Sequence, residues 1–117
     1  MKHTVMIVED DLDASETLRE FLEEEGYAVV CASDGSRALV VASEVDHLCL
    51  VFLDLYMPGM NGWDFFTAFK AQPRFSGVPV AVVTSAPDRA PVGVEMVLPK
   101  PIALTSVLAT AAAHCPF

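Results

Sequence analysis

Short apolar segments alternate along the chain with segments in which hydrophobic residues recur at helical spacing. The predicted strands are residues 4–8, 27–31, 48–53, 79–84 and 95–98. The predicted helices are residues 13–25, 36–43, 63–70 and 102–113. Strand 48–53 is apolar throughout, as is typical of a strand that is covered on both faces. The alternation therefore predicts an α/β fold: a doubly wound parallel sheet with helices on both faces.

Local signals set the ends of the predicted elements. Asp13 can cap the first helix, which runs to Glu25, and Gly26 can end it. Residues 57–62 contain proline and glycine and predict a loop before the aromatic helix 63–70, whose rings we expect in the core.

One crossover is too short to hold a helix. Only ten residues lie between Thr84 and Glu95, and they include Pro87, Pro91 and Gly93. A parallel crossover that contains a helix needs about 10–12 residues or more. Each proline would also remove a helix hydrogen bond from this short segment. We therefore predict that the fourth helix is missing or reduced to a turn.

Composition narrows the class of protein. The chain has 117 residues, and 16 acidic against 7 basic residues give a formal net charge of −9. This length predicts a single domain over residues 1–117, without an output domain. The lysines at positions 2, 70 and 100 form no cluster, which argues against nucleic-acid binding. The sequence shows no signal peptide and no membrane-length apolar run, so we expect a cytoplasmic protein with no membrane contact.

The cysteines are odd in number and show no paired spacing. Cys31, Cys49 and Cys115 therefore predict free thiols of a reducing compartment rather than a disulfide or a zinc site. Zinc is also disfavoured because the histidines are scattered along the chain, at positions 3, 47 and 114.

Polar residues follow the predicted strands where each strand ends. They are Glu9, Asp10 and Asp11, then Asp54, then Thr84 and Ser85, and finally Lys100. In a doubly wound sheet such groups gather at one edge, beyond the carboxyl ends of the strands. Crowded carboxylates repel one another and need a cation, and oxygen ligands favour Mg²⁺. A carboxylate beside Mg²⁺, a lysine and a hydroxyl is suited to accepting a phosphoryl group.

These residues, in this order, resemble the receiver domain of two-component response regulators. The matching stretches are VMIVEDD at 5–11, ASDG at 32–35 with AL at 38–39, LDLYMPGMNG at 53–62, VPVAVVTSA at 78–86 and LPKP at 98–101. The resemblance covers nearly the whole chain. It implies a five-stranded sheet in the flavodoxin-like order 2-1-3-4-5.

The resemblance also implies a role for each site residue. Asp54 would be the phosphoacceptor that attacks a phosphohistidine of a histidine kinase or phosphotransfer protein. Asp10, with Asp54 and the backbone carbonyl of Tyr56, would hold Mg²⁺, and Glu9 would act through water. Thr84 would bond a phosphoryl oxygen and Lys100 would pair with the phosphoryl group. The bond from Lys100 to Pro101 would be cis, and Asp11 matches no site position.

The sequence departs from the family in ways that bear on signalling. Val97 stands where members usually have an aromatic residue that turns inward when the threonine moves. The missing fourth helix removes half of the usual signalling face. The last helix has no charged residue before His114. This indicates either that the side formed by the last helix and the fifth strand contacts a downstream partner or a second copy, or that it is merely a poorly charged surface. Tyr56 and Ala86 flank the path of water and predict slow self-dephosphorylation.

We therefore expect a phosphoacceptor module that signals through protein contacts and catalyses only its own phosphotransfer. The alternative is a pseudo-receiver that binds partners and never takes phosphate, a reading that Val97 keeps open. An aspartyl-phosphate phosphatase needs a second acid two residues after the nucleophile, where this chain has Tyr56. A flavodoxin has the same strand order, but the acids at 9–11 would repel the phosphate of FMN.

Overall fold

A computed structural model of the chain describes residues 3–115 and contains one parallel sheet. Its strands are β1 (Thr4–Val8), β2 (Ala28–Ala32), β3 (Leu48–Asp54), β4 (Val80–Thr84) and β5 (Met96–Pro99). They lie in the order β2-β1-β3-β4-β5, and each neighbouring pair is parallel. This confirms the predicted fold class and strand order.

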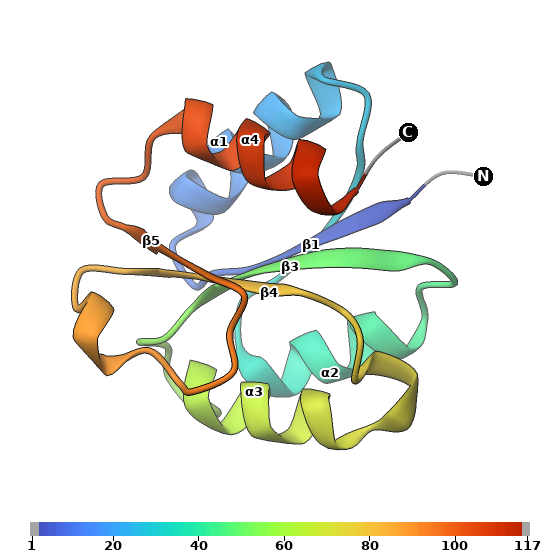
Figure 1. Ribbon diagram of the computed structural model, residues 1–117, viewed down its shortest axis with the longest axis vertical. Helices are drawn as coiled ribbons and strands as arrows, with labels where there is room; N and C mark the ends of the chain where they lie inside the picture. The colour runs from blue at the N-terminus through green and yellow to red at the C-terminus, as the bar shows by residue number, and fades with distance from the viewer. Residues whose placement is uncertain (1–2, 116–117) are drawn as a thin grey trace.

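Helices cover both faces of the sheet, two on each side (Figure 1). They are α1 (Leu12–Glu24), α2 (Gly35–Ser43), α3 (Gly62–Ala71) and α4 (Leu104–His114). Leu18, Leu22 and Val107 of α1 and α4 pack on one face, and the aromatic residues Phe65 and Phe69 of α3 pack on the other. Within residues 3–115 no helix is both long and apolar enough to span a membrane.

The shortened crossover between β4 and β5 forms a single 3₁₀ turn, η2 (Pro87–Arg89), as predicted. A second turn, η1 (Pro73–Phe75), precedes β4. The crossover lies against α3, and Ala90 and Val94 pack on the same core as the α3 aromatic residues.

The cap of α1 differs from the prediction. Asp11, not Asp13, caps the helix: its side chain accepts hydrogen bonds from the N–H groups of Asp13 at 3.0 Å and Ala14 at 3.2 Å. Asp11 has extended backbone angles, which the cap position requires, whereas Asp13 already lies in the first turn. Gly26, with φ of +97°, follows the last turn as expected.

The prediction of three free thiols is wrong for two of the cysteines. Cys49 in β3 and Cys115, which follows α4, form a disulfide, with a Cα–Cα distance of 5.5 Å. Their sequence separation of 66 residues carries no pairing signal, because only the docking of α4 on the sheet brings them together. Cys31 is the one free cysteine.

Candidate functional site

The carboxyl ends of four strands meet at one edge of the sheet and carry the predicted polar residues. Glu9 and Asp10 follow β1, Asp54 ends β3, Thr84 ends β4, and Lys100 follows β5. The parallel register holds these ends level: Asp54 pairs with Val83, the neighbour of Thr84 in β4. β1, β3 and β4 each pair with two neighbours, and β5 pairs with β4 at the edge of the sheet, so the site is built on rigid elements.

Three carboxylates crowd together at this edge. One oxygen from each of Glu9, Asp10 and Asp54 lies within 4.8 Å of the others. Glu9 is 8% exposed and Asp54 is 6% exposed, while Asp10 faces solvent. The Oε2 atom of Glu9 is buried and has no hydrogen-bond partner. An oxygen-only cluster with an unpaired buried carboxylate oxygen fits a divalent cation such as Mg²⁺.

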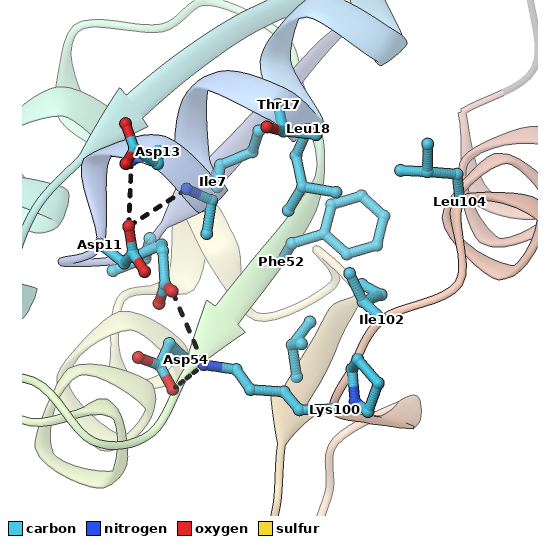
Figure 2. A pocket seen from close by; sticks show the side chains of 15 residues that line it. Ile7, Asp11, Asp13, Thr17, Leu18, Phe52, Asp54, Lys100, Ile102 and Leu104 are labelled. Atoms are coloured by element: carbon cyan, nitrogen blue, oxygen red, sulfur yellow. Dashed lines mark hydrogen bonds and ion pairs between the residues drawn. The ribbon is translucent and has the colours of Figure 1, made fainter.

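Lys100 brings the positive charge that the cluster requires. Its Nζ lies 3.4 Å from Asp54 Oδ1 and 3.6 Å from Glu9 Oε1. Figure 2 shows the lysine reaching toward Asp54, with both ion pairs drawn as dashed lines. The backbone positions it: Lys100 N–H donates to the carbonyl of Thr84 at 3.0 Å, and the Lys100–Pro101 peptide is cis, as the family resemblance implies.

Charge and burial alter the acidity of two of these groups. Burial is the main cause that raises the pKa of Glu9 from 4.5 to about 8, and its hydrogen bond to Asp54 and the charge of Asp54 act in the same direction. Burial lowers the pKa of Lys100, but the Asp54 and Glu9 carboxylates outweigh it and raise that pKa overall. Without a metal ion, these shifts favour the charged form of Lys100 and the protonated form of Glu9, which lowers the repulsion within the cluster.

Thr84 lies at the same edge, but its hydroxyl is engaged elsewhere. The residue is 0% exposed, and its Oγ1 accepts a hydrogen bond from the N–H of Ala86 at 3.0 Å. The loop after β3 is tied to the site as well, since Tyr56 N–H lies 3.4 Å from Asp54 Oδ1. All of the predicted site residues therefore follow strands that end at this edge, although the threonine hydroxyl bonds its own loop.

Two features beside the site were not predicted from the sequence: a cavity and the contacts of Trp63. A cavity of about 470 Å³ adjoins the carboxylates, walled by Ala14 and Leu18 of α1, Phe52 of β3 and Ile102 after β5 (Figure 2). The indole of Trp63, at the start of α3, contacts two loops: the loop after β3, at Tyr56, and the crossover after β4, at Arg89. The helical spacing of the aromatic residues predicted core positions, and that holds for Phe69 but only partly for Trp63, which is half-buried.

The comparisons with known proteins point to one family. A family model described as the response regulator receiver domain matches residues 5–112. The chain is 38% identical over 88 residues to the DNA-binding response regulator MtrA of Mycolicibacterium smegmatis, covering 75% of this chain and 37% of that protein. It is 38% identical over 85 residues to the uncharacterized transcriptional regulatory protein YrkP of Bacillus subtilis, covering 73% and 35%. The chain thus spans little more than a third of these relatives.

Solved structures agree over nearly the whole chain. The chemotaxis response regulator CheY4 of Vibrio cholerae matches with a TM-score of 0.85 and 26% identity, covering 97% of this chain and 98% of that one. The receiver domain of the hybrid histidine kinase CckA matches with a TM-score of 0.80 and 28% identity, covering 94% and 96%.

Proposed function

Because this chain belongs to the response regulator receiver domain family, we propose that it is a phosphorylation-dependent signalling module whose acceptor is Asp54. The family match and the relatives identify a receiver domain of a two-component response regulator. The acceptor, the donor and the metal are our proposal. The observation that carries it is the buried Asp54 carboxylate, which is paired with Lys100 Nζ at 3.4 Å inside a carboxylate cluster.

In the proposed step, a carboxylate oxygen of Asp54 attacks the phosphorus of a phosphohistidine on a histidine kinase or phosphotransfer protein. The new O–P bond forms as the N–P bond breaks, and the imidazole leaves with the electron pair of that bond. Lys100 offsets negative charge on the transferring oxygens. The Thr84 hydroxyl turns away from the N–H of Ala86 and donates a hydrogen bond to one of those oxygens.

Mg²⁺ is the cofactor of this proposal. Asp10 and Asp54, with the backbone carbonyl of Tyr56, would hold the ion, and Glu9 would act through a water molecule. When bound, the ion supplies positive charge that offsets the charge of the phosphoryl oxygens.

The proposal extends to partners and location. The chain would turn over no separate substrate, since it is itself the acceptor, and it would pass the signal through protein contacts. DNA binding is named for relatives such as MtrA. We propose none for this chain itself, because its net charge is −9 and its basic residues are scattered. The proposal places the chain in the cytoplasm with its donor.

Intact mass spectrometry tests the acceptor. After incubation with Mg²⁺ and acetyl phosphate, the wild-type chain should gain the mass of one phosphoryl group. The gain should be absent without Mg²⁺ and absent in Asp54→Asn. Asp46→Asn, which changes an exposed aspartate remote from the cluster, is the matched control and should behave as wild type.

A negative result with acetyl phosphate is followed by a phosphorylated histidine kinase as donor. No gain of mass from either donor would overturn the proposal. The chain would then be a pseudo-receiver that acts as a binding module.

A further inference from the structure

Trp63 contacts two loops that leave the site from different strands. Its ring meets the Tyr56 ring edge-on, with centroids 5.2 Å apart and an interplanar angle of 81°. Its Nε1 donates a hydrogen bond of 2.9 Å to the carbonyl of Arg89, 26 residues further along the chain. One side chain thus joins the loop after β3 to the crossover after β4.

Each of these two loops is bonded in turn to a residue of the proposed phosphoryl site. Tyr56 N–H lies 3.4 Å from Asp54 Oδ1. On the other side, Arg89 N–H donates to the carbonyl of Ala86 at 3.0 Å, and Ala86 N–H donates to Thr84 Oγ1 at 3.0 Å. Asp54 and Thr84 lie at the ends of the adjacent strands β3 and β4, and a continuous series of contacts joins them through Trp63.

This series of contacts involves the shortened crossover, one of the two features, with Val97, in which the chain departs from its family. Val97 is an apolar residue with one main rotamer and cannot carry a hydroxyl or a ring in and out of the sheet. The crossover has only the turn η2 in place of a helix. The crossover contacts β5 and also α3, where Trp63 bonds the carbonyl of Arg89 and a Cβ placed on Gly93 would lie 3.8 Å from Cζ of Phe66. A change in the crossover can therefore reach α3 through Trp63.

We propose that Trp63 is a positioning residue that couples residues 85–95 to the loop after β3 and holds the ring of Tyr56, whose backbone N–H lies 3.4 Å from Asp54 Oδ1. When the Thr84 hydroxyl turns to a phosphoryl oxygen, the N–H of Ala86 loses its acceptor. A part-buried N–H without a partner is costly, so the turn that ends at Arg89 rearranges and its carbonyl moves against the indole. This inference rests on the proposed function, because it needs Asp54 to take a phosphoryl group.

Two substitutions separate the two contacts of Trp63. Trp63→Phe keeps a ring against Tyr56 and removes the N–H that bonds Arg89, whereas Trp63→Leu removes both. Phe66→Leu is the matched control, since it loosens α3 against the same crossover without touching Tyr56 or the Arg89 bond. The readouts are hydrogen exchange of residues 55–64, on the far side of Trp63 from the crossover, with and without Mg²⁺ and beryllofluoride, a stable analogue of the aspartyl phosphate, and the half-life of the phosphoryl group by intact mass.

In the wild type, exchange of residues 55–64 should change when beryllofluoride binds. Trp63→Phe should lose that change yet keep the wild-type phosphoryl half-life. Trp63→Leu should also shorten the half-life about 2-fold to 10-fold, the range that corresponds to the free energy of one aromatic pair. Phe66→Leu should retain both the exchange response and the half-life.

The inference is overturned if Trp63→Phe keeps the exchange response, if Trp63→Leu keeps the half-life, or if Phe66→Leu reproduces either loss. A wild type that is phosphorylated but shows no exchange change in residues 55–64 overturns it too, and leaves the proposed function intact. A wild type that takes neither phosphoryl group nor beryllofluoride overturns the proposed function, and this inference with it.

Discussion

Glu9 holds its proton far more tightly than an exposed carboxyl group does. The causes are its burial and the neighbouring Asp54 carboxylate, which together raise its pKa from 4.5 to about 8. The Oε2 atom of Glu9 is buried without a hydrogen-bond partner, which fits a site that is completed when a cation binds. A divalent cation among Glu9, Asp10 and Asp54 would replace the proton as the source of positive charge.

The pH dependence of stability follows from this acidity. Between pH 4.5 and about 8 the folded chain keeps the Glu9 proton, whereas the unfolded chain has lost it. The folded state binds more protons, so without divalent cation the free energy of unfolding should fall as pH rises through this window. Added Mg²⁺ should stabilise more strongly toward the upper end, because it competes with the proton.

Urea unfolding at both ends of the window measures this contribution. Glu9→Gln should remove it and flatten the metal-free slope relative to wild type. Glu20→Gln, which changes an exposed glutamate of α1, should leave the wild-type slope in place. An unchanged slope in Glu9→Gln would show that Glu9 is not the responsible group.

Tyr56 bears on how long a phosphoryl group lasts. Tyr56 is 47% exposed, its ring packs edge-on against Trp63, and its backbone N–H lies 3.4 Å from Asp54 Oδ1. Because a bulky ring obstructs water that would attack the acyl phosphate, Tyr56→Asn should shorten the phosphoryl half-life, measured by intact mass after the donor is removed. Tyr56→Phe keeps the ring and should keep the half-life. Equal half-lives in wild type and Tyr56→Asn would contradict this role.

At the scale of elements, the start of α1 depends on one side chain. The sequence predicted Asp13 as the cap, whereas the structure shows Asp11 in that position. The backbone conformation decides which acid is the cap. The cap residue must have extended backbone angles, and its carboxylate must accept hydrogen bonds from N–H groups two and three residues further along the chain. Asp11 meets both conditions and bonds the N–H groups of Asp13 and Ala14. Asp13 contributes only as an acid in the first turn, near the positive end of the helix dipole.

Substitution of these two acids should therefore have unequal effects. Asp11→Ala should lower the free energy of unfolding by about 1 kcal/mol, because two N–H groups lose their acceptor. Asp13→Ala should lower it by only about 0.3–1 kcal/mol, the dipole contribution. Urea unfolding of the two variants beside wild type measures both. A larger loss in Asp13→Ala would reverse the assignment of the cap.

The crossover from β4 to β5 shows which elements a sequence can predict. Pro87, Pro91 and the short spacing exclude a full helix by local rules alone, and the turn η2 confirms this. The partner of the crossover had no local signal, because the bond from Trp63 to Arg89 joins segments 26 residues apart. The uncharged last helix has exposed Ala109, Ala112 and Ala113, and a partner on that side stays a prediction.

At the scale of the whole molecule, two rules were enough to predict the fold and most of the site. One is the periodicity of strands and helices, and the other is that a doubly wound sheet presents the carboxyl ends of its strands at one edge. Glu9, Asp54 and Lys100 meet as that rule requires, although they are far apart in the sequence. The protonation of Glu9 and the pairing of the cysteines could not be predicted in this way. The acidity of Glu9 depends on burial, and the pairing of Cys49 with Cys115 depends on how α4 docks. Neither is encoded in local sequence.

The disulfide closes a loop of 66 residues and joins the end of the chain to β3. Cross-links of this span stabilise a fold by up to about 4 kcal/mol, mainly through the unfolded state. Reduction should therefore lower the free energy of unfolding. Phosphorylation of Asp54 should persist, because Lys100 is held separately by its bond to the carbonyl of Thr84.

Urea unfolding with and without dithiothreitol tests the cross-link, with two cysteine variants as controls. Cys115→Ser should match the reduced wild type and ignore the reductant. Cys31→Ser removes only the free thiol and should respond as wild type does. If the wild type ignores reductant and thiol titration finds all three cysteines free, the disulfide is absent in solution. The original expectation of a reduced chain would then hold for the whole molecule, and α4 would depend on its packing alone.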